Sequence, residues 1–193
     1  MNEITLLLAD AFADWEYAFI AGTGGAYFDF NIGFITPDPG MVRSQGGLMV
    51  HVADGIDRFT PDASTTLVVI GSAIWAGDTA PDTRAGLPEL LQAHHDAGGV
   101  VAGICGGTLP LARAGLLDHC AHSSNSLAFL TDAVAPYKGQ GHYVAGPKAV
   151  SDNRIVTAPG TAPVSFTAEV FAQSGLDPEA CGQFRTMLAA EHA

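Results

Sequence analysis

The fold is decided by the stretch Val100-Val101-Ala102-Gly103-Ile104-Cys105-Gly106-Gly107-Thr108. Its first five residues are apolar or small, which is typical of a strand buried on both faces of a parallel sheet. The following G-x-C-G-G pattern is the thiol version of the nucleophile elbow, a tight turn from strand to helix. Such a turn strains the backbone, and Gly103, Gly106 and Gly107 leave the space that it needs. The stretch therefore predicts a reactive cysteine, Cys105, at the end of a buried strand.

Strand-like and helix-like segments alternate on both sides of this stretch. We expect strands at residues 4–9, 31–36, 66–71, 100–104 and 154–157, a short strand near 121–123, a hairpin or edge segment at 47–51, and helices at 14–22, 87–97, 109–117, 126–135, 164–173 and 178–190. This alternation predicts an α/β fold with a mostly parallel sheet covered by helices on both faces. Without a linker or repeat, one domain over residues 1–193 is expected.

Composition narrows the function classes. Apolar residues make up 48% of the 193-residue chain and charged residues 15%, which favours a folded protein with a large core. The net charge of −12 argues against nucleic acid and anionic membranes as partners, because both attract basic surfaces. The apolar run at residues 4–9 is too short for a signal peptide or a membrane helix. We therefore expect no membrane association.

The cysteines indicate the compartment. The chain has three, Cys105, Cys120 and Cys181, with no C-x-x-C pair. An odd and sparse set fits a reducing cytoplasm better than secretion, and it gives no support to a structural zinc site.

Three segments resemble the ThiJ/PfpI superfamily. Residues 102–118, AGICGGTLPLARAGLLD, are similar to its elbow; residues 9–16, ADAFADWE, to its first loop; and residues 152–163, DNRIVTAPGTAP, to its late strand and turn. The resemblance spans about residues 3 to 175. It implies a flavodoxin-like three-layer sandwich, commonly assembled as a homodimer.

The resemblance places a carboxyl group, Glu16, beside Cys105. A carboxyl next to a thiolate in a dry cleft has a raised pKa, so that it can donate a hydrogen bond or a proton. The N-terminus of the helix after Cys105 is expected to favour the thiolate. The alternative for Glu16 is a solvated glutamate at a helix start.

The sequence departs from the family pattern at the position where many relatives carry a histidine. The slot where many relatives place a histidine falls on Asn125, which we expect in the pocket, while His122 lies three residues earlier. An odd separation on a strand puts two side chains on opposite faces. His122 is therefore a catalytic candidate only if the chain bends there, and otherwise a structural histidine. Position 106 is glycine, so the Cys-His dipeptide of the protease-like branch is also missing.

An oxyanion site needs backbone donors near the sulfur. The resemblance points to the amides of Gly71 and Ser72, and the elbow adds that of Gly106. Trp75, soon after the third core strand, is expected either to line the pocket or to pack in the core.

No cofactor is expected. The glycines after Cys105 are not followed by the Lys-Ser or Lys-Thr pair of a phosphate loop, and no His–carboxylate cluster has the spacing of a metal site. Residues 157–163 also lack the His-x-Glu of a glutamine amidotransferase.

The leading hypothesis is a cysteine-dependent enzyme that acts on a small electrophile: a reactive carbonyl, an amide or an isonitrile. The missing histidine favours chemistry by a cysteine and an acid alone over peptide hydrolysis. A second hypothesis is a redox sensor whose Cys105 is oxidised to sulfinate without turnover. A third is a chaperone-like binding dimer, which would need an exposed apolar patch around the cleft.

Overall fold

The computed structural model describes residues 3–77 and 86–190. Six strands form one sheet in the order β2-β1-β5-β6-β8-β7. Their bounds are Glu3–Leu7 for β1, Asn31–Ile35 for β2, Thr65–Val69 for β5, Val100–Ile104 for β6, Val150–Asp152 for β7 and Ile155–Ala158 for β8. All neighbours in this order are parallel except β7, which runs antiparallel to β8. The predicted mostly parallel sheet is confirmed.

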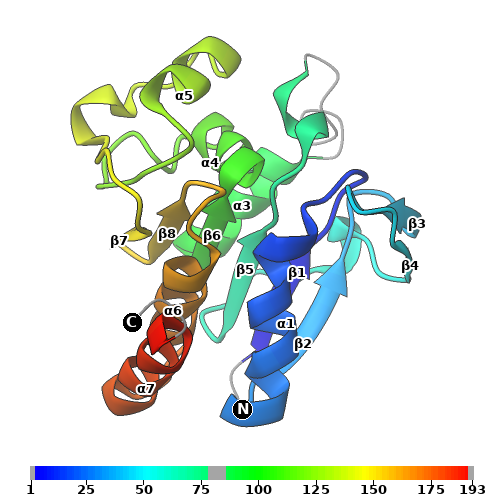
Figure 1. Ribbon diagram of the computed structural model, residues 1–193. Helices are drawn as coiled ribbons and strands as arrows, with labels where there is room; N and C mark the ends of the chain where they lie inside the picture. Colours follow the sequence, from blue (N-terminus) through cyan, green and yellow to red (C-terminus); the bar gives the residue numbers. More distant parts are fainter. Residues whose placement is uncertain (1–2, 78–85, 191–193) are drawn as a thin grey trace.

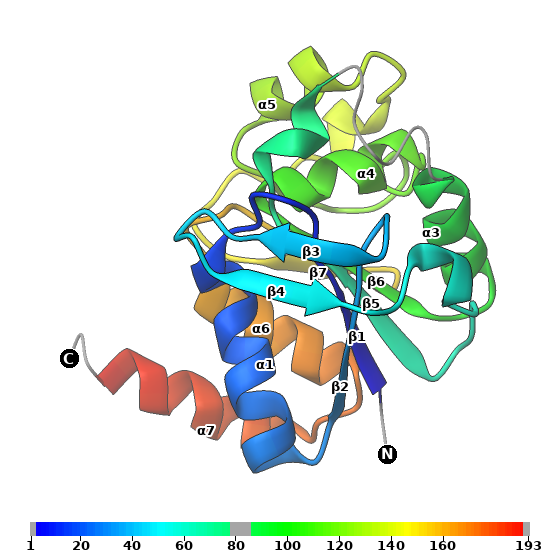
Figure 2. The same ribbon diagram turned by 90° about the vertical axis from the view of Figure 1, so that its right-hand side faces the viewer.

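Helices cover both faces of the sheet. One face carries α1 (Asp14–Phe28), α6 (Pro163–Gln173) and α7 (Pro178–Ala189), and the other carries α3 (Leu87–Asp96), α4 (Thr108–Arg113) and α5 (Leu127–Ala133). Figure 2 shows α1, α6 and α7 on one side of the strands and α3 on the other. Successive residues of β5 point to opposite faces, so Val68 packs in the first core and Leu67 in the second. The predicted three-layer sandwich is confirmed.

The parallel strands bring distant segments to one edge of the sheet (Figure 1). In register, Gly103 of β6 pairs with Val69 of β5 on one side and with Thr157 of β8 on the other. The chain therefore leaves β5, β6 and β8 at almost the same level. The carboxyl ends of parallel strands are where ligands bind in such folds.

Helix α1 is longer than predicted, because it continues through glycines to Phe28. A Cβ atom on Gly24 would lie 2.9 Å from Ile32 Cδ1 and 3.5 Å from Phe171, so this glycine lets the helix approach β2 and α6 closely. A helix-breaking residue is tolerated here because tertiary packing outweighs its low helix propensity.

Two smaller predictions need adjustment. The segment at 47–51 belongs to an antiparallel hairpin of β3 (Gly40–Arg43) and β4 (Met49–Val52). The expected strand near 121–123 is a single bridge between His122 and Tyr143.

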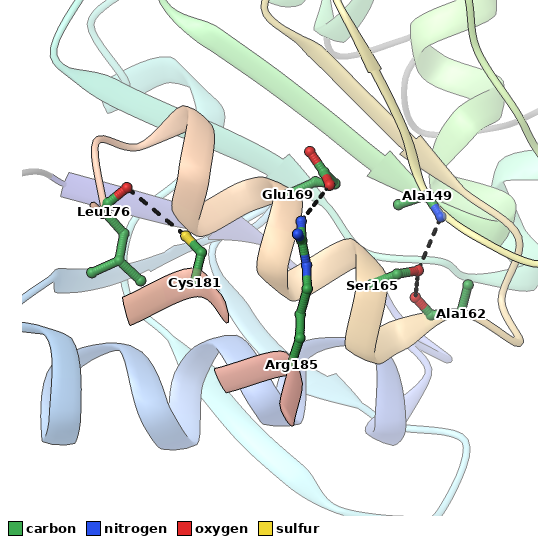
Figure 3. A network of polar contacts seen from close by, with 7 residues as sticks. All are labelled: Ala149, Ala162, Ser165, Glu169, Leu176, Cys181 and Arg185. Carbon is green, nitrogen blue, oxygen red and sulfur yellow. Dashed lines mark hydrogen bonds and ion pairs between the residues drawn. The ribbon is translucent and has the colours of Figure 1, made fainter. Parts of the chain in front are cut away.

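The two C-terminal helices are joined by polar and aromatic contacts. Arg185 Nη2 donates to Glu169 Oε1 at 2.6 Å, as Figure 3 shows. The Phe171 and Phe184 rings lie 5.7 Å apart. Both members of the ion pair are partly exposed, so it contributes about 1 kcal/mol at most, and the buried rings carry more of the stability.

Among the helices of residues 3–77 and 86–190, none has the length and apolarity that crossing a membrane requires.

Candidate active site

Cys105 follows β6 directly and lies in the left-handed backbone region with a φ of 55°. This conformation is strained for a residue with a Cβ atom, and it occurs where the surrounding structure fixes it. Here Gly106 and Gly107 pack against the backbone after β5. A Cβ atom on Gly106 would lie 2.6 Å from the Ser72 carbonyl oxygen, and one on Gly107 would overlap the Val69 carbonyl oxygen. The predicted elbow is present, with the thiol partly exposed at its tip.

Glu16 lies in the first turn of α1, and its side chain is 0% exposed. Its Oε2 accepts a hydrogen bond of 2.8 Å from the Gly71 amide. Its Oε1 is buried without a hydrogen-bond partner among the described N–H and O–H groups, and the carboxyl interacts with the Cys105 thiol. Burial raises the pKa of Glu16 to about 7, against the lowering effects of the Gly71 amide and Cys105.

Two glycines leave room for this pair. A Cβ atom on Gly160, after β8, would lie 2.9 Å from Cys105 Sγ and 3.0 Å from Glu16 Oε1. A Cβ atom on Gly71 would lie 2.9 Å from Cys105 Cβ and would overlap Glu16 Oε2. The sulfur and the carboxyl oxygen therefore border the same small space, which any side chain at Gly160 would fill.

The expected lowering of the thiol pKa is wrong. Burial, and then the negative charge of Glu16, raise the pKa of Cys105 above its ordinary value, although Asn125 and the Gly106 amide act in the opposite direction. The helix that follows has only six residues, and its partial charge does not outweigh these effects. The charge of Glu16 makes the Cys105 thiol harder to ionise, whereas the thiol lowers the pKa of Glu16, so the titration of each group depends on the other.

Asn125 contacts the sulfur of Cys105 as a hydrogen-bond donor. Its Oδ1 accepts the Gly160 amide hydrogen at 3.0 Å, and its Nδ2 donates to Cys105 Sγ at 3.2 Å. Because a backbone N–H only donates, Oδ1 must face Gly160, and the NH₂ group must face the sulfur. Asn125 therefore stabilises negative charge on the sulfur but cannot accept its proton.

A shallow pocket of about 560 Å³ opens beside the thiol. Its lining residues are Trp15, Cys105, Asn125, Gly160, Thr161 and Pro163, none of which carries a formal charge in its side chain apart from an ionised thiol. Trp15 is 48% exposed, and its indole N–H donates to the Gly160 carbonyl oxygen at 2.9 Å. Trp15 is not among the site residues predicted from the sequence, although its position directly before Glu16 is a signal for it.

The catalytic hypothesis for His122 is wrong. The side chain is fully buried, and burial lowers its pKa, so the ring is neutral at pH 7. Its Nδ1 donates to the Cys120 carbonyl oxygen at 2.8 Å, and its Nε2 accepts from the Tyr137 hydroxyl at 2.6 Å. No ring nitrogen is left for Cys105. Asn125 points to the sulfur and His122 points elsewhere, although the segment that joins them is not a regular strand.

Two other assignments are corrected. The Gly71 amide donates to Glu16 and is not available as an oxyanion donor. Trp75 is fully buried in the core on the α3 side, where its indole donates to the Ile70 carbonyl oxygen, so it does not line the pocket. The Gly106 amide does point to the Cys105 side chain. Ser72 packs against Gly106 and donates its hydroxyl hydrogen to the Asp10 carbonyl oxygen, and its amide remains a predicted donor.

Across residues 3–77 and 86–190, no three His, Cys, Asp or Glu side chains are grouped so that they could hold a metal ion. Cys105, Cys120 and Cys181 are all free thiols.

Comparison with known proteins places this geometry in context. The model of the family described as DJ-1/PfpI family matches residues 2–173. The chain is 30% identical over 176 residues to a Bacillus subtilis protein named uncharacterized protease YoaZ, covering 88% of this chain and 81% of that protein. It is 32% identical over 167 residues to the uncharacterized protease YdeA of the same organism, covering 86% and 80%.

Solved structures of proteins from the same superfamily have a similar fold. A DJ-1 superfamily protein from Agrobacterium tumefaciens superposes with a TM-score of 0.90 at 38% identity, covering 100% of both chains. A thiJ/pfpI family protein from Bacillus anthracis gives a TM-score of 0.88 at 28% identity, covering 98% of this chain and 91% of the other.

Proposed function

Because this chain belongs to the DJ-1/PfpI family, we propose that it is a cysteine-dependent enzyme in which Cys105 attacks a small neutral electrophile and Glu16 carries the proton. One observation carries this proposal: a strained, partly exposed thiol lies beside a buried carboxyl whose second oxygen lacks a conventional partner. An unpaired buried acceptor is costly for stability, and such a group is retained where it has a chemical task.

The proposed reaction begins with proton transfer. The thiol proton of Cys105 moves to Glu16 Oε1 while Sγ forms a bond to the electrophilic carbon. For a carbonyl substrate, the π electron pair of the C=O bond moves to its oxygen, and the Glu16 proton then neutralises that oxygen. The product of this step is a tetrahedral thiol adduct, and Glu16 is again a carboxylate. A carboxyl with a pKa near 7 is suited to both halves of the transfer.

The pocket favours substrates without a formal charge. Its six lining residues offer aromatic, proline and backbone surface with a single amide side chain. Without a cation among those residues, a carboxylate or phosphate substrate would lose its hydration without compensation. We therefore expect a small reactive carbonyl, a simple amide or an isonitrile. The B. subtilis relatives are named proteases, so short peptides belong in the same test.

The test is turnover of a panel of these four substrate classes by the wild-type protein and by Cys105→Ser, with intact-mass detection of the adduct. The proposal expects turnover in at least one class and a covalent adduct located on Cys105. Full turnover by Cys105→Ser would contradict it, as would the lack of both turnover and adduct for every class.

A redox sensor is the second candidate, because Cys105 is the only partly exposed cysteine and the other two are buried. Mild peroxide would then add two oxygen atoms to Cys105 selectively, and no electrophile would be turned over. The raised thiol pKa opposes rapid oxidation, so we rank the enzyme first.

Homodimer formation and a cytoplasmic location stay predictions. Met41, Leu48 and Met49 on and beside the β3–β4 hairpin are exposed apolar side chains that fit burial in an assembly. Light scattering on the purified protein tests the dimer directly.

A further inference from the structure

Three hydrogen bonds form a continuous chain from the rim of the pocket to the sulfur. The indole of Trp15 donates to the Gly160 carbonyl oxygen at 2.9 Å, the Gly160 amide donates to Asn125 Oδ1 at 3.0 Å, and Asn125 Nδ2 donates to Cys105 Sγ at 3.2 Å. The four residues come from α1, the turn after β8, the segment before α5 and the elbow. They are brought together only by the fold.

Gly160 connects Trp15 to Asn125 in this series of hydrogen bonds. Its peptide groups are held on both sides, at the carbonyl by Trp15 and at the N–H by Asn125. It has no side chain to fix it otherwise, because a Cβ atom there would lie 2.9 Å from Cys105 Sγ. If the indole bond is lost, the Gly160 backbone can rotate, and the acceptor that orients Asn125 is no longer fixed.

We propose that Trp15 is a positioning residue: it acts through Gly160 to hold the Asn125 NH₂ group on the sulfur of Cys105. The proposal rests on the proposed function for its catalytic relevance, but not for its test. Among residues 3–77 and 86–190, Asn125 is the one side-chain amide that donates to Sγ, and a donor there stabilises the thiolate more than the thiol. Through Trp15, a ligand bound at the rim of the pocket would therefore affect the reactivity of the Cys105 thiol.

The orientation of the Asn125 side-chain amide determines whether it stabilises or repels a thiolate at Cys105. An amide turned by 180° would present Oδ1 to the sulfur and would repel a thiolate instead of stabilising it. Only the Gly160 N–H distinguishes the two orientations in the described structure. Because Trp15 is 48% exposed, a ligand that stacks on its ring lies against the group that sets this orientation.

The test is the pH dependence of Cys105 alkylation by iodoacetamide, followed by peptide mass spectrometry. Trp15→Phe keeps an aromatic side chain but removes the indole N–H. We expect the midpoint of its pH–rate curve to rise by about one pH unit, with an unchanged limiting rate at high pH, where the thiol is fully ionised. Tyr27→Phe, on the same helix and 75% exposed in the wild type, is the matched control and leaves the midpoint unchanged.

A double-mutant cycle separates positioning from a general structural effect. Asn125→Ala removes the donor, and we expect it to raise the midpoint at least as much as Trp15→Phe does. Trp15→Phe added to Asn125→Ala then produces no further shift, because Trp15 acts through Asn125. Equal shifts in the presence and absence of Asn125, or no shift for Trp15→Phe, would overturn the proposal. Alkylation does not require turnover, so failure of the proposed reaction would not mimic either result.

Discussion

The surroundings of Cys105 and of Cys120 each combine a cysteine with titratable neighbours, but only those of Cys105 have the features of a reactive site. Around Cys120, the buried His122 and Tyr137 and the partly buried Tyr143 form a cluster in which each polar side-chain group has a partner. Both nitrogens of His122 are occupied, and the Cys120 thiol donates to the Leu116 carbonyl oxygen at 3.3 Å. At Cys105, the neighbouring carboxyl has one unpaired oxygen, the backbone is strained, and a pocket opens beside the thiol. The two clusters therefore differ less in residue type than in two features of the Cys105 cluster: a carboxyl oxygen without a hydrogen-bond partner, and a pocket that gives access to the thiol.

The thiol pKa values alone do not distinguish the two clusters, because both are raised. Burial and the charges of Asp152 and Asp118 raise the pKa of Cys120 to about 11, and the pKa of Cys105 is raised too. Neither thiol is ionised to a large extent at neutral pH in the resting protein. In the proposed mechanism Cys105 differs because Glu16 takes its proton when a bond forms, whereas Cys120 faces a carbonyl oxygen, which is too weak a base for this.

The largest expected effect on activity comes from replacing the sulfur of Cys105 with oxygen, and the same replacement at Cys120 is the comparison. Cys105→Ser should lower kcat/KM by about 10³-fold or more, because the hydroxyl is a much weaker nucleophile without a strong base. Cys120→Ser, which keeps a donor for Leu116, should change kcat/KM by less than about twofold. Steady-state kinetics on the substrate found in the panel checks both. Equal losses in the two variants would remove the contrast between the clusters.

Glu16→Gln is expected to have the next largest effect. Glutamine still accepts the Gly71 amide hydrogen but cannot take the thiol proton, so kcat/KM should fall by about 10²-fold. The change of rate with pH near 7 should disappear as well, because the group with a pKa of about 7 is removed. A pH–rate profile that stays the same in this variant would show that another group carries the proton.

The same substitution should stabilise the protein at alkaline pH. The folded-state pKa of Glu16 is raised from 4.5 to about 7, so the folded chain binds more protons than the unfolded chain in this window. The free energy of unfolding therefore falls as pH rises from about 4.5 to 7, by roughly 2–3 kcal/mol for an isolated group. Urea denaturation at pH 5 and pH 8 should show a gain for Glu16→Gln at pH 8 only. A gain at both values would contradict the buried acid.

Gly160→Ala tests the space between the sulfur and the carboxyl. The added Cβ would lie 2.9 Å from Sγ and 3.0 Å from Glu16 Oε1, closer than ordinary contact, so the pair must separate. We expect the alkylation rate of Cys105 to change by about tenfold, with a stability loss of about 1–2 kcal/mol. Gly146→Ala, where a Cβ atom meets nothing within 4 Å, is the matched control.

His122→Phe should have the smallest effect on activity. It leaves the Cys120 carbonyl and the Tyr137 hydroxyl without their partner, which costs about 1–3 kcal/mol of stability. Ser123 and Ser124 still hold the intervening chain through Thr157 and Thr108, so Asn125 keeps its place, and kcat/KM should stay within about twofold. A large loss of kcat/KM in a folded variant would return His122 to the catalytic site.

The fold was largely predictable because its signals are local. The continuous apolar run at Val100–Ile104 gave the bounds of β6, and the glycines after it gave the elbow. Helix α1 was underestimated because a local view of Gly24 shows a poor helix former, while its contacts with Ile32 and Phe171 are made 8 and 147 residues away in the chain. Strand β7 has only three residues and pairs through a tight turn, so it carries little periodicity.

The site was predictable only in part. Cys105 and Glu16 follow from the motifs, and Asn125 from the shifted histidine slot. The destination of the Gly71 amide was not visible, because its acceptor on Glu16 lies 55 residues away in sequence. Trp15 and Trp75 look alike in the sequence, but the first bonds to Gly160 across 145 residues and stays at the surface, while the second bonds to Ile70 and is buried. Such long-range hydrogen bonds leave no local pattern.

The central claim is that Glu16 is a buried acid poised to exchange a proton with Cys105. The most direct measurement is a ¹³C NMR titration of the glutamate side-chain carboxyl carbons, with the Glu16 signal assigned from its absence in Glu16→Gln. The account predicts a titration midpoint near 7 for Glu16, well above its ordinary value of 4.5. A Glu16 signal that titrates at or below 4.5 would contradict the claim, because the carboxyl would then be a fixed anion unable to hold the thiol proton at neutral pH.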